Sequence, residues 1–351
     1  MNEITRVGVD LAKSVIEVHA VDSSGRAVSR RTLARKSFMD WCARLPGGCV
    51  VAMEACSGAH HWARKLEQLG TGLQVRLIAP HHVGPYRMQG KSGKNDANDA
   101  AAVCEAASRP QMHFVPTKTL QQQGVLAVHR MREGWKKDRT ACINRIRGLL
   151  AEFGLVAPLQ PQALRLRLAQ MLEDGANELP GVVRLAIERA AQQWSQLDED
   201  LAWCDQRVRE HVRSDERARR ANELLGVGEL AASAIVATVG DFSQFRNGRQ
   251  FAAWLGLVPA QNSSGGKTRL GGITKRGDEY LRMLLVQGGK AVVNCAKPRE
   301  ERVWQWADAL SKRQGWQKAA VALAAKNARI LWAMFTRGEA FVPNHVSVKP
   351  A

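Results

Sequence analysis

Four acidic residues in the first hundred positions have the type and spacing of metal ligands: Asp10, Glu54, Asp96 and Asp99. Asp96 and Asp99 are three positions apart at the expected start of a helix, so their side chains share one face of it. Four carboxylates that met in one place would repel one another strongly unless divalent cations lay between them. Two Mg²⁺ ions about 3.5 to 4 Å apart can activate an attacking oxygen and stabilise a leaving one in phosphodiester chemistry. We therefore predict a catalytic Mg²⁺ site, which Mn²⁺ could also occupy.

Each acid also has an ordinary structural alternative. Asp10 could be a turn residue at the end of a strand, Glu54 could cap the helix that follows it, and Asp96 could stabilise a helix N-terminus. Taken together, these alternatives require all four acids to fall by coincidence where one fold would bring them together. We therefore favour a shared metal site.

The segments around these acids predict the strands and helices that would position them. Runs of β-branched or alternating apolar residues predict strands, and Asp-Ser-Ser-Gly supplies a turn between the second and the third. This succession of elements is that of an α/β RNase H-like fold, in which the fourth strand lies beside the first. Asp10 and Glu54 would then end neighbouring strands. The expected strands cover 7–9, 15–20, 27–33, 50–53 and 75–79, with helices at 37–45 and 62–69.

A serine in a glycine-rich, basic segment is the second candidate for chemistry. Ser263 and Ser264 precede Gly265 and Gly266, and three more glycines follow by position 277. Glycines let the backbone approach a phosphate closely, and basic side chains can hold its charge. The hydroxyl is a weak nucleophile unless a metal or a base activates it. From the residues alone, a phosphate-binding loop without chemistry fits this segment better.

Two other features of the sequence could contribute to DNA cleavage or DNA binding. Tyr280 could compete as a nucleophile, but it lies in an apolar-periodic helix expected at 279–286, which favours a packing role. The run from Leu224 to Gly228 is similar to the turn of a helix-hairpin-helix, whose amides can hold a DNA phosphate. An ordinary glycine-containing turn between helices fits that run equally well.

Basic side chains are the candidates for nucleic-acid contacts. The segment from 118 to 147 carries eight basic residues against two acidic ones, a pattern that suits a helix following a phosphate backbone. A solvated helix face is the alternative. The expected contact residues are Lys91, Lys94, Arg130, Arg132, Lys136, Lys137, Arg139, Arg145, Arg147, Lys267, Arg269, Lys275 and Arg276.

A heptad pattern follows the basic segment. Apolar residues recur at alternating spacings of four and three over about three heptads, which is typical of a coiled-coil seam. The pattern fits either an intermolecular pair or an antiparallel hairpin within one chain. The seam consists of Val183, Ile187, Ala190, Trp194, Leu197, Leu201, Cys204 and Val208.

The composition restricts the class of partner. Lys and Arg number 51 against 33 Asp and Glu, which gives a formal charge of +18 over 351 residues. Such an excess makes a polyanion, nucleic acid first of all, the expected partner. The length favours two or three domains. Seven cysteines without a C-x-x-C pair argue against a zinc knuckle or a disulfide framework and predict buried thiols in a reducing cytoplasm. We expect neither a signal peptide nor a membrane span.

Three motifs around the acids resemble those of a known family. GVDLAK, AMEACSGAHHWA and GKNDANDA look like the DEDD motifs of the RuvC-like transposases of IS110-type insertion sequences. The stretch from LLGVGELAAS to TKRGDEYLR resembles the C-terminal transposase domain of that family, and its SSGGK form resembles the IS1111 group. The resemblance covers nearly the whole chain and is weakest at 157–214. It implies a RuvC-like DEDD domain at 1–116, a basic helical and coiled-coil connector at 117–214, and a mostly α-helical transposase domain at 215–351.

The resemblance also implies an activity. The family members recombine DNA at specific sites and are guided to donor and target DNA by a structured bridge RNA that the element encodes. Carried over to this chain, the four acids would bind the metal, and Ser264 would be the nucleophile of a phosphoserine intermediate. Recombination must hold two DNA partners together, which favours a dimer or tetramer and hence an intermolecular use of the seam. We expect the protein in the bacterial cytoplasm, associated with the nucleoid.

Two other functions fit parts of the sequence. One is a RuvC-like, metal-dependent nuclease specific for DNA structure, in which a metal-bound water attacks and no covalent intermediate forms. The other is a non-catalytic scaffold for RNA or DNA, whose carboxylates only cap helices. The role of Ser264 distinguishes the recombinase from the nuclease, and the role of Asp10 distinguishes both enzymes from the scaffold.

Overall fold

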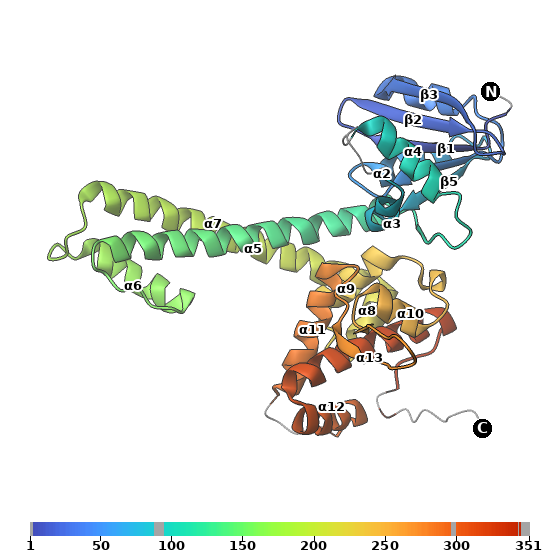
Figure 1. Ribbon diagram of the computed structural model, residues 1–351. Helices are drawn as coiled ribbons and strands as arrows, with labels where there is room; N and C mark the ends of the chain where they lie inside the picture. The colour runs from blue at the N-terminus through green and yellow to red at the C-terminus, as the bar shows by residue number, and fades with distance from the viewer. Residues whose placement is uncertain (1–2, 88–94, 296–299, 343, 345–351) are drawn as a thin grey trace. The chain divides into compact units, whose positions relative to one another are not determined.

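The computed structural model describes residues 3–87, 95–295, 300–342 and 344, and it divides the chain into two compact units (Figure 1). The first unit ends at Leu120 and the second begins at Gln121. The second unit contains the expected connector, 117–214, from residue 121 onwards. It also contains the expected C-terminal domain, 215–351. In the described part of the chain, no helix combines the length and the apolar character needed to cross a lipid bilayer.

The first unit is built on a six-stranded mixed sheet with the order β3-β2-β1-β4-β5-β6. The first three strands form an antiparallel meander, and β4 lies parallel to β1 on one side and to β5 on the other. The predicted meander and the predicted pairing of the first and fourth strands are confirmed, as expected for an RNase H-like α/β fold. The strands are β1 (Arg6–Leu11), β2 (Val15–Val21), β3 (Ala27–Ala34), β4 (Val50–Glu54), β5 (Gln74–Ile78) and β6 (Phe114–Val115).

Helices lie on both faces of this sheet. Side chains of a strand alternate between the faces, so Val7 and Val9 of β1 pack in one core with α1 and α2. Ala52 of β4 packs on the opposite face with apolar residues of α4. Gly8 and Asp10 alternate with the two valines and therefore belong to the α4 face. The helices of this unit are α1 (Arg35–Cys42), α2 (Ala59–Glu67), α3 (Pro80–Val83), the 3-10 turn η1 (Gly84–Tyr86) and α4 (Asp96–Ala106).

Gly8 allows α4 to lie very close to β1. A Cβ atom at this position would be 2.1 Å from the carbonyl oxygen of Ala100 and 2.6 Å from Cys104 Cβ. Any larger residue would therefore push the helix away from the strand. Because Asp99 directly precedes Ala100, the contact also holds this acid near the end of β1.

In its described residues, the second unit is α-helical apart from one two-stranded hairpin. Three helices, α5 to α7, enclose one apolar cluster, and α8 to α11 share a larger one with α13. The elements are α5 (Leu120–Glu152), α6 (Pro161–Glu173), α7 (Gly181–Ser214), α8 (Glu216–Asn222), α9 (Glu229–Val239), η2 (Phe242–Gln244), α10 (Gly248–Trp254), β7 (Pro259–Gln261), β8 (Leu270–Ile273), α11 (Glu279–Val293), α12 (Arg302–Gln314) and α13 (Trp316–Arg337).

The heptad seam of α7 packs against α5 of the same chain, and the two helices lie side by side in Figure 1. Arg132 Nε donates to Asp205 Oδ1 at 2.6 Å, and Arg139 Nε donates to Asp198 Oδ1. Since the lower-numbered arginine pairs with the higher-numbered aspartate, the helices are antiparallel. The seam therefore forms the intramolecular hairpin. Our expectation that it joins two chains is corrected, because α5 already covers its apolar side chains.

The hairpin predicts unequal effects of the same substitution on two faces of α7. Leu197 is 7% exposed within the α5–α7 cluster, whereas Leu185 is 64% exposed. We expect Leu197→Ala to lower the free energy of unfolding by about 2 to 5 kcal/mol, through lost burial and the cavity left behind. Leu185→Ala should change it by less than about 0.5 kcal/mol. Urea denaturation followed by tryptophan fluorescence measures both, and equal effects would contradict the hairpin.

A buried chain of polar side chains links four helices of the second unit. The hydroxyl of Tyr280 on α11 is hydrogen-bonded to His129 Nδ1 on α5 at 3.0 Å, and His129 Nε2 contacts Ser233 Oγ on α9 at 2.9 Å. His211 Nδ1 on α7 contacts the same serine oxygen at 2.9 Å. His129 and Ser233 are almost completely buried. The chain fixes α5, α7, α9 and α11 relative to one another, because burial makes each unmade hydrogen bond costly.

Protonation of this network should destabilise the second unit. Burial lowers the pKa of His129 from 6.5 to about 4, with smaller contributions from His211 and Arg132. The folded state therefore favours the neutral imidazole, so its stabilising effect is complete above pH 6.5 and is lost as the pH falls towards 4. We expect the free energy of unfolding to decrease over this range. His129→Gln should flatten the decrease, whereas His61→Gln, which changes an exposed imidazole, should leave it intact. Parallel pH profiles for wild type and His129→Gln would refute the assignment.

Candidate active site

Three of the four predicted acids lie on elements that meet on the α4 face of the sheet. Asp10 lies on β1 and Glu54 is the last residue of β4, one position beyond the paired residues Val9 and Met53. Asp99 lies in the first turn of α4 and is 7% exposed. The parallel pairing of β1 and β4 and the close packing of α4 therefore bring these carboxylates to one place.

The electrostatics of Asp10 confirm that the acids are close. Its pKa is raised from 3.8 to about 6, first by burial and then by the negative charges of Asp96, Asp99 and Glu54, while Arg87 lowers it. A carboxyl group responds in this way when like charges share a partly desolvated site. All four predicted acids thus contribute to one electrostatic cluster, with Asp96 on its exposed side.

Arg87 is an additional member of the cluster that the sequence did not single out. Its Nη2 donates to Glu54 Oε2 at 2.7 Å, and its Nε lies 2.8 Å from Asp99 Oδ1. One guanidinium therefore spans two carboxylates on different elements. It follows η1, and no spacing in the sequence relates it to either acid.

The capping alternative fails for Glu54, whereas Asp96 does lie in the first turn of a helix, as its alternative expected. The N-cap of α2 is Gly58, which makes no side-chain cap, and the Glu54 carboxylate instead accepts from Arg87. The N-cap of α4 is Asn95, whose Oδ1 accepts from the Asn98 amide at 2.8 Å. Asp96 adds only a favourable charge at that helix start.

The donor set fits a hard divalent cation. Carboxylate oxygens are the ligands that Mg²⁺ and Mn²⁺ accept, and four carboxylates lie here beside the single guanidinium of Arg87. Within the described ranges, no three His, Cys, Asp or Glu side chains already adopt a metal-binding geometry. The ion pairs of Arg87 explain this, since they hold Glu54 and Asp99 on a guanidinium.

The predicted serine lies in the second unit, at the turn of the hairpin formed by β7 and β8. Gly265 and Gly266 have φ values of 55° and 75°, which is the turn geometry that two consecutive glycines favour. The Lys267 amide donates to the Ser264 carbonyl oxygen at 3.1 Å and closes the turn. Ser263 Oγ accepts from Gln261 Nε2 at 2.9 Å, whereas no side-chain hydrogen bond within the described residues engages Ser264 Oγ.

Tyr280 is disfavoured as the nucleophile. Its ring packs against the core of the second unit, and its hydroxyl is hydrogen-bonded to the buried His129. Burial raises the pKa of this hydroxyl above its ordinary value of 10. Each effect makes the phenolate harder to form, which agrees with the packing role expected from the sequence.

The basic residues of α5 fall into two groups. Arg132 and Arg139 are ion-paired with α7, and Arg147 donates to the carbonyl oxygens of Pro158 and Leu159. Arg132 and Arg139 therefore hold α5 against α7. Arg147 holds the end of α5 against the segment that precedes α6. Exposed positions are occupied by Arg130, Lys136, Lys137 and Arg145, and in the β-hairpin by Lys267, Arg269, Lys275 and Arg276. Lys91 and Lys94 lie outside the described residues.

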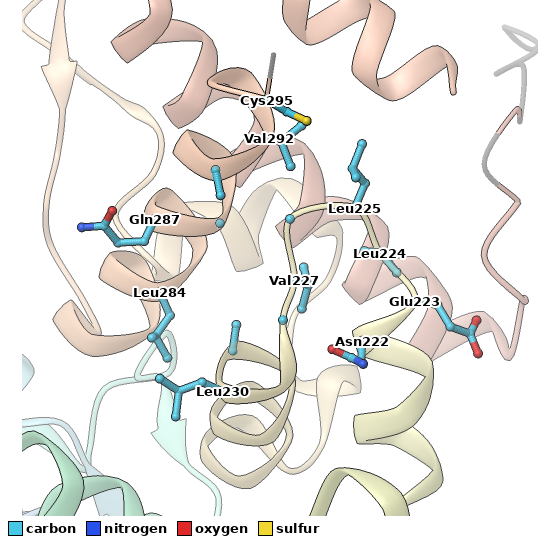
Figure 2. Close-up of a pocket in the computed structure, with 15 residues that line it drawn as sticks. Asn222, Glu223, Leu224, Leu225, Val227, Leu230, Leu284, Gln287, Val292 and Cys295 are labelled. Carbon is cyan, nitrogen blue, oxygen red and sulfur yellow. The ribbon is translucent and has the colours of Figure 1, made fainter. Parts of the chain in front are cut away.

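The glycine turn at 223–228 joins α8 to α9, as a helix-hairpin-helix requires. It lines a cavity of about 680 Å³ together with residues of α11 (Figure 2). Gly226 has φ 85° and packs directly on α11, where a Cβ atom at Gly288 would be 1.8 Å from the Gly226 carbonyl oxygen. Helix packing therefore explains Gly226, in line with the ordinary-turn alternative.

The cysteines are used mainly in packing. Five of the seven are buried, as predicted, but Cys56 is exposed beside the acid cluster. For Cys56 the expectation of burial was wrong. This cysteine lies in the turn between β4 and α2, outside the strands and helices whose side chains form the core. Burial and the charges of Glu54 and Asp10 raise the pKa of its thiol.

Comparison with known proteins places the chain in a family. Residues 7–154 match the DEDD transposase model of IS110 type, and residues 218–305 match the model described as the transposase IS116/IS110/IS902 family. A probable family 20 transposase of Pseudomonas aeruginosa is 46% identical over 97% of this chain and 99% of its own length. The chain belongs to the IS110 family of transposases.

Other relatives of this transposase are also described as transposases. The transposase for insertion sequence element IS1111A of Coxiella burnetii is 40% identical over 97% of this chain and 92% of its own length. The transposase for IS1328 of Yersinia enterocolitica is 37% identical over 97% and 99%. The protein is therefore an enzyme of DNA cleavage and transfer encoded by an insertion sequence, and DNA is its partner. A DEDD domain generally implies the use of divalent metal ions.

Repulsion among the acids should be measurable in the metal-free transposase. The folded state holds the Asp10 proton more tightly than the unfolded state, so this group lowers stability as the pH rises from about 4 to about 6. We expect Asp10→Asn to raise the free energy of unfolding at pH 8 in EDTA and to have little effect at pH 4. Asp40→Asn, on the exposed face of α1, is the control. A lower stability of Asp10→Asn at pH 8 would show that the acid cluster carries no excess charge.

Proposed function

We propose that this transposase is an RNA-guided, site-specific recombinase that cuts and rejoins DNA through a bond between Ser264 and a DNA phosphate. The observation that carries the proposal is the convergence of the acids, with the raised pKa of Asp10 as its signature. The exposed hairpin that presents Ser264 among basic residues supports the choice of nucleophile. The bridge RNA rests on the family resemblance and on the charge of +18.

In this proposal Asp10, Glu54 and Asp99 hold the metal ions, and Asp96 contributes from the solvent side. Mg²⁺, or Mn²⁺ in its place, supplies positive charge for the scissile phosphate and lowers the pKa of the attacking oxygen. The chain's own residues fix the geometry, because β1, β4 and α4 are rigid elements packed through Gly8. A site on such elements keeps its carboxylates in place between turnovers.

The serine step conserves the energy of the broken bond. Ser264 Oγ forms a bond to phosphorus, its proton passes to a base, and the bond from phosphorus to one deoxyribose oxygen breaks. That oxygen leaves as a hydroxyl after it takes a proton. The hydroxyl end of a second strand then attacks the phosphoserine and releases Ser264. The number of phosphoester bonds is unchanged, so rejoining needs no energy cofactor.

The exposed basic residues supply the nucleic-acid surface in this proposal. Arg130, Lys136, Lys137 and Arg145 would follow a phosphate backbone along α5, and Lys267, Arg269, Lys275 and Arg276 would hold the DNA beside the serine. The proposal also assigns contacts to Lys91 and Lys94, and smaller ones to Arg132, Arg139 and Arg147. A dimer or tetramer would hold two DNA partners through a surface other than the α7 seam.

Trapping of the covalent intermediate tests the proposal. Transposase, element RNA and labelled DNA are incubated with Mg²⁺ and analysed on a denaturing gel for a protein–DNA adduct. We expect an adduct with wild type and none with Ser264→Ala, which deletes one hydroxyl and no charge and should still bind DNA. Ser263→Ala should retain the adduct, since the Ser263 hydroxyl already accepts a hydrogen bond from Gln261. Asp10→Asn or excess EDTA should abolish it.

Each departure from this pattern has a definite meaning. An adduct that persists in Ser264→Ala but disappears in Ser263→Ala would move the nucleophile by one residue. DNA cleavage that persists in both serine variants, but not in Asp10→Asn, would establish a nuclease that uses water. Undiminished cleavage in EDTA would refute the metal site.

A further inference from the structure

Arg87 occupies the oxygen atoms that a metal ion would need. Its guanidinium lies 2.7 Å from Glu54 Oε2 and 2.8 Å from Asp99 Oδ1, and these residues belong to different elements, β4 and α4. The two carboxylate side chains are only 17% and 10% exposed, whereas the arginine side chain is 39% exposed. The acids are thus held in the protein, while the arginine side chain is partly exposed although its Nε is buried.

A guanidinium and a divalent cation that bind the same carboxylates weaken each other's binding. Arg87 donates a charged hydrogen bond to Glu54 and forms an ion pair with Asp99, and both contacts offset the negative charge of these carboxylates, which a cation at about 2.1 Å would also need. Arg87 supplies one positive charge beside four carboxylates, and its ion pairs reach only Glu54 and Asp99, which leaves negative charge in excess. A divalent cation would neutralise more of it and is therefore the stronger partner once its hydration is replaced.

A released arginine would be left at the open side of the site. Arginine binds phosphate through two parallel hydrogen bonds, and a guanidinium near a reacting phosphorus stabilises the charge that develops in the transition state. The same side chain is thus suited to two partners in succession: the carboxylates before the metal binds and the DNA phosphate afterwards.

We propose that Arg87 is a latch on the active site, which holds Glu54 and Asp99 in the metal-free transposase and passes to the DNA phosphate when divalent metal takes the carboxylates. The inference rests on the proposed function, since it takes these acids as the metal ligands. It adds a residue that competes with the metal and then contacts the substrate. Metal and DNA binding consequently strengthen each other through one side chain.

The first test measures metal binding without DNA. Mn²⁺ is titrated into wild type, Arg87→Gln, Arg87→Lys and Arg109→Gln, and free Mn²⁺ is followed by electron paramagnetic resonance. Arg109 is the matched control because it pairs with Glu105 on the exposed face of α4. We expect Arg87→Gln to bind Mn²⁺ at least about tenfold more tightly, as loss of a competing charged hydrogen bond implies. Arg87→Lys should lie between, and Arg109→Gln should match wild type.

Thermal unfolding provides a second measure of the same competition. In EDTA, Arg87→Gln should unfold at a lower temperature than wild type, because Glu54 and Asp99 lose their counter-charge. Added Mn²⁺ should raise its unfolding temperature by more than it raises that of wild type. This readout requires only a folded first unit, and it does not depend on catalysis.

The second test measures DNA binding with Ca²⁺, a divalent cation used to support binding in place of Mg²⁺. With Ca²⁺, Arg87→Gln should bind element DNA about tenfold more weakly than wild type, and in EDTA the two should bind alike. Equal Mn²⁺ affinity in wild type and Arg87→Gln would overturn the latch while leaving the metal site intact. Tighter Mn²⁺ binding without a Ca²⁺-dependent loss of DNA affinity would overturn the transfer to phosphate. No Mn²⁺ binding to any variant would refute the metal site itself, and the latch with it.

Discussion

The concentration of negative charge on one face of a sheet is the constraint on which the first unit depends. Gly8 lets α4 approach β1 so closely that Asp99 comes to lie with Asp10 and Glu54 in a partly desolvated place. Folding alone would not favour this arrangement, since like charges at short range repel. It persists because the apolar faces of β1, β4 and α4 bury enough surface to hold the carboxylates together. The repulsion is then available to bind cations.

Arg87 and a divalent cation are two solutions to the same electrostatic problem. The arginine is built into the chain and balances one charge, so the metal-free domain can fold with its carboxylates already in position. In the proposed metal site a cation would balance more charge, and it would need little rearrangement of the backbone. Preorganisation of this kind lowers the free energy that binding must supply. Without metal the site therefore keeps unbalanced negative charge, and its backbone already has the arrangement that we propose for metal binding.

The second unit solves a different problem, the presentation of an exposed serine from a rigid support. Two consecutive glycines with positive φ form the turn at Ser264, and β8 is followed closely by α11, which carries Tyr280. The hydrogen bond from Tyr280 to His129 ties that helix to α5, and Ser233 extends the tie to α7 through His211. The exposed loop between β7 and β8 is thus followed in the chain by a helix whose position is fixed by buried polar contacts. Ion pairs between α5 and α7 do the same for the long helical hairpin.

The sequence by itself predicted the first five strands, because alternation of apolar residues is a local property, and the succession of elements predicted the meander and the pairing of the first and fourth strands. It did not predict the short strands β6, β7 and β8. It also singled out the four acids, which the fold brings into one cluster. It also determined the glycine turn at Ser264. It left open the partner of the α7 seam, since a heptad repeat specifies an apolar stripe and not the helix that covers it; the fold chose α5. Arg87 had no signal at all, because its relation to Glu54 and Asp99 exists only once β4, η1 and α4 are folded side by side. The network at His129 was equally invisible, since its members are separated by up to 151 positions in the chain and meet only in the packed core.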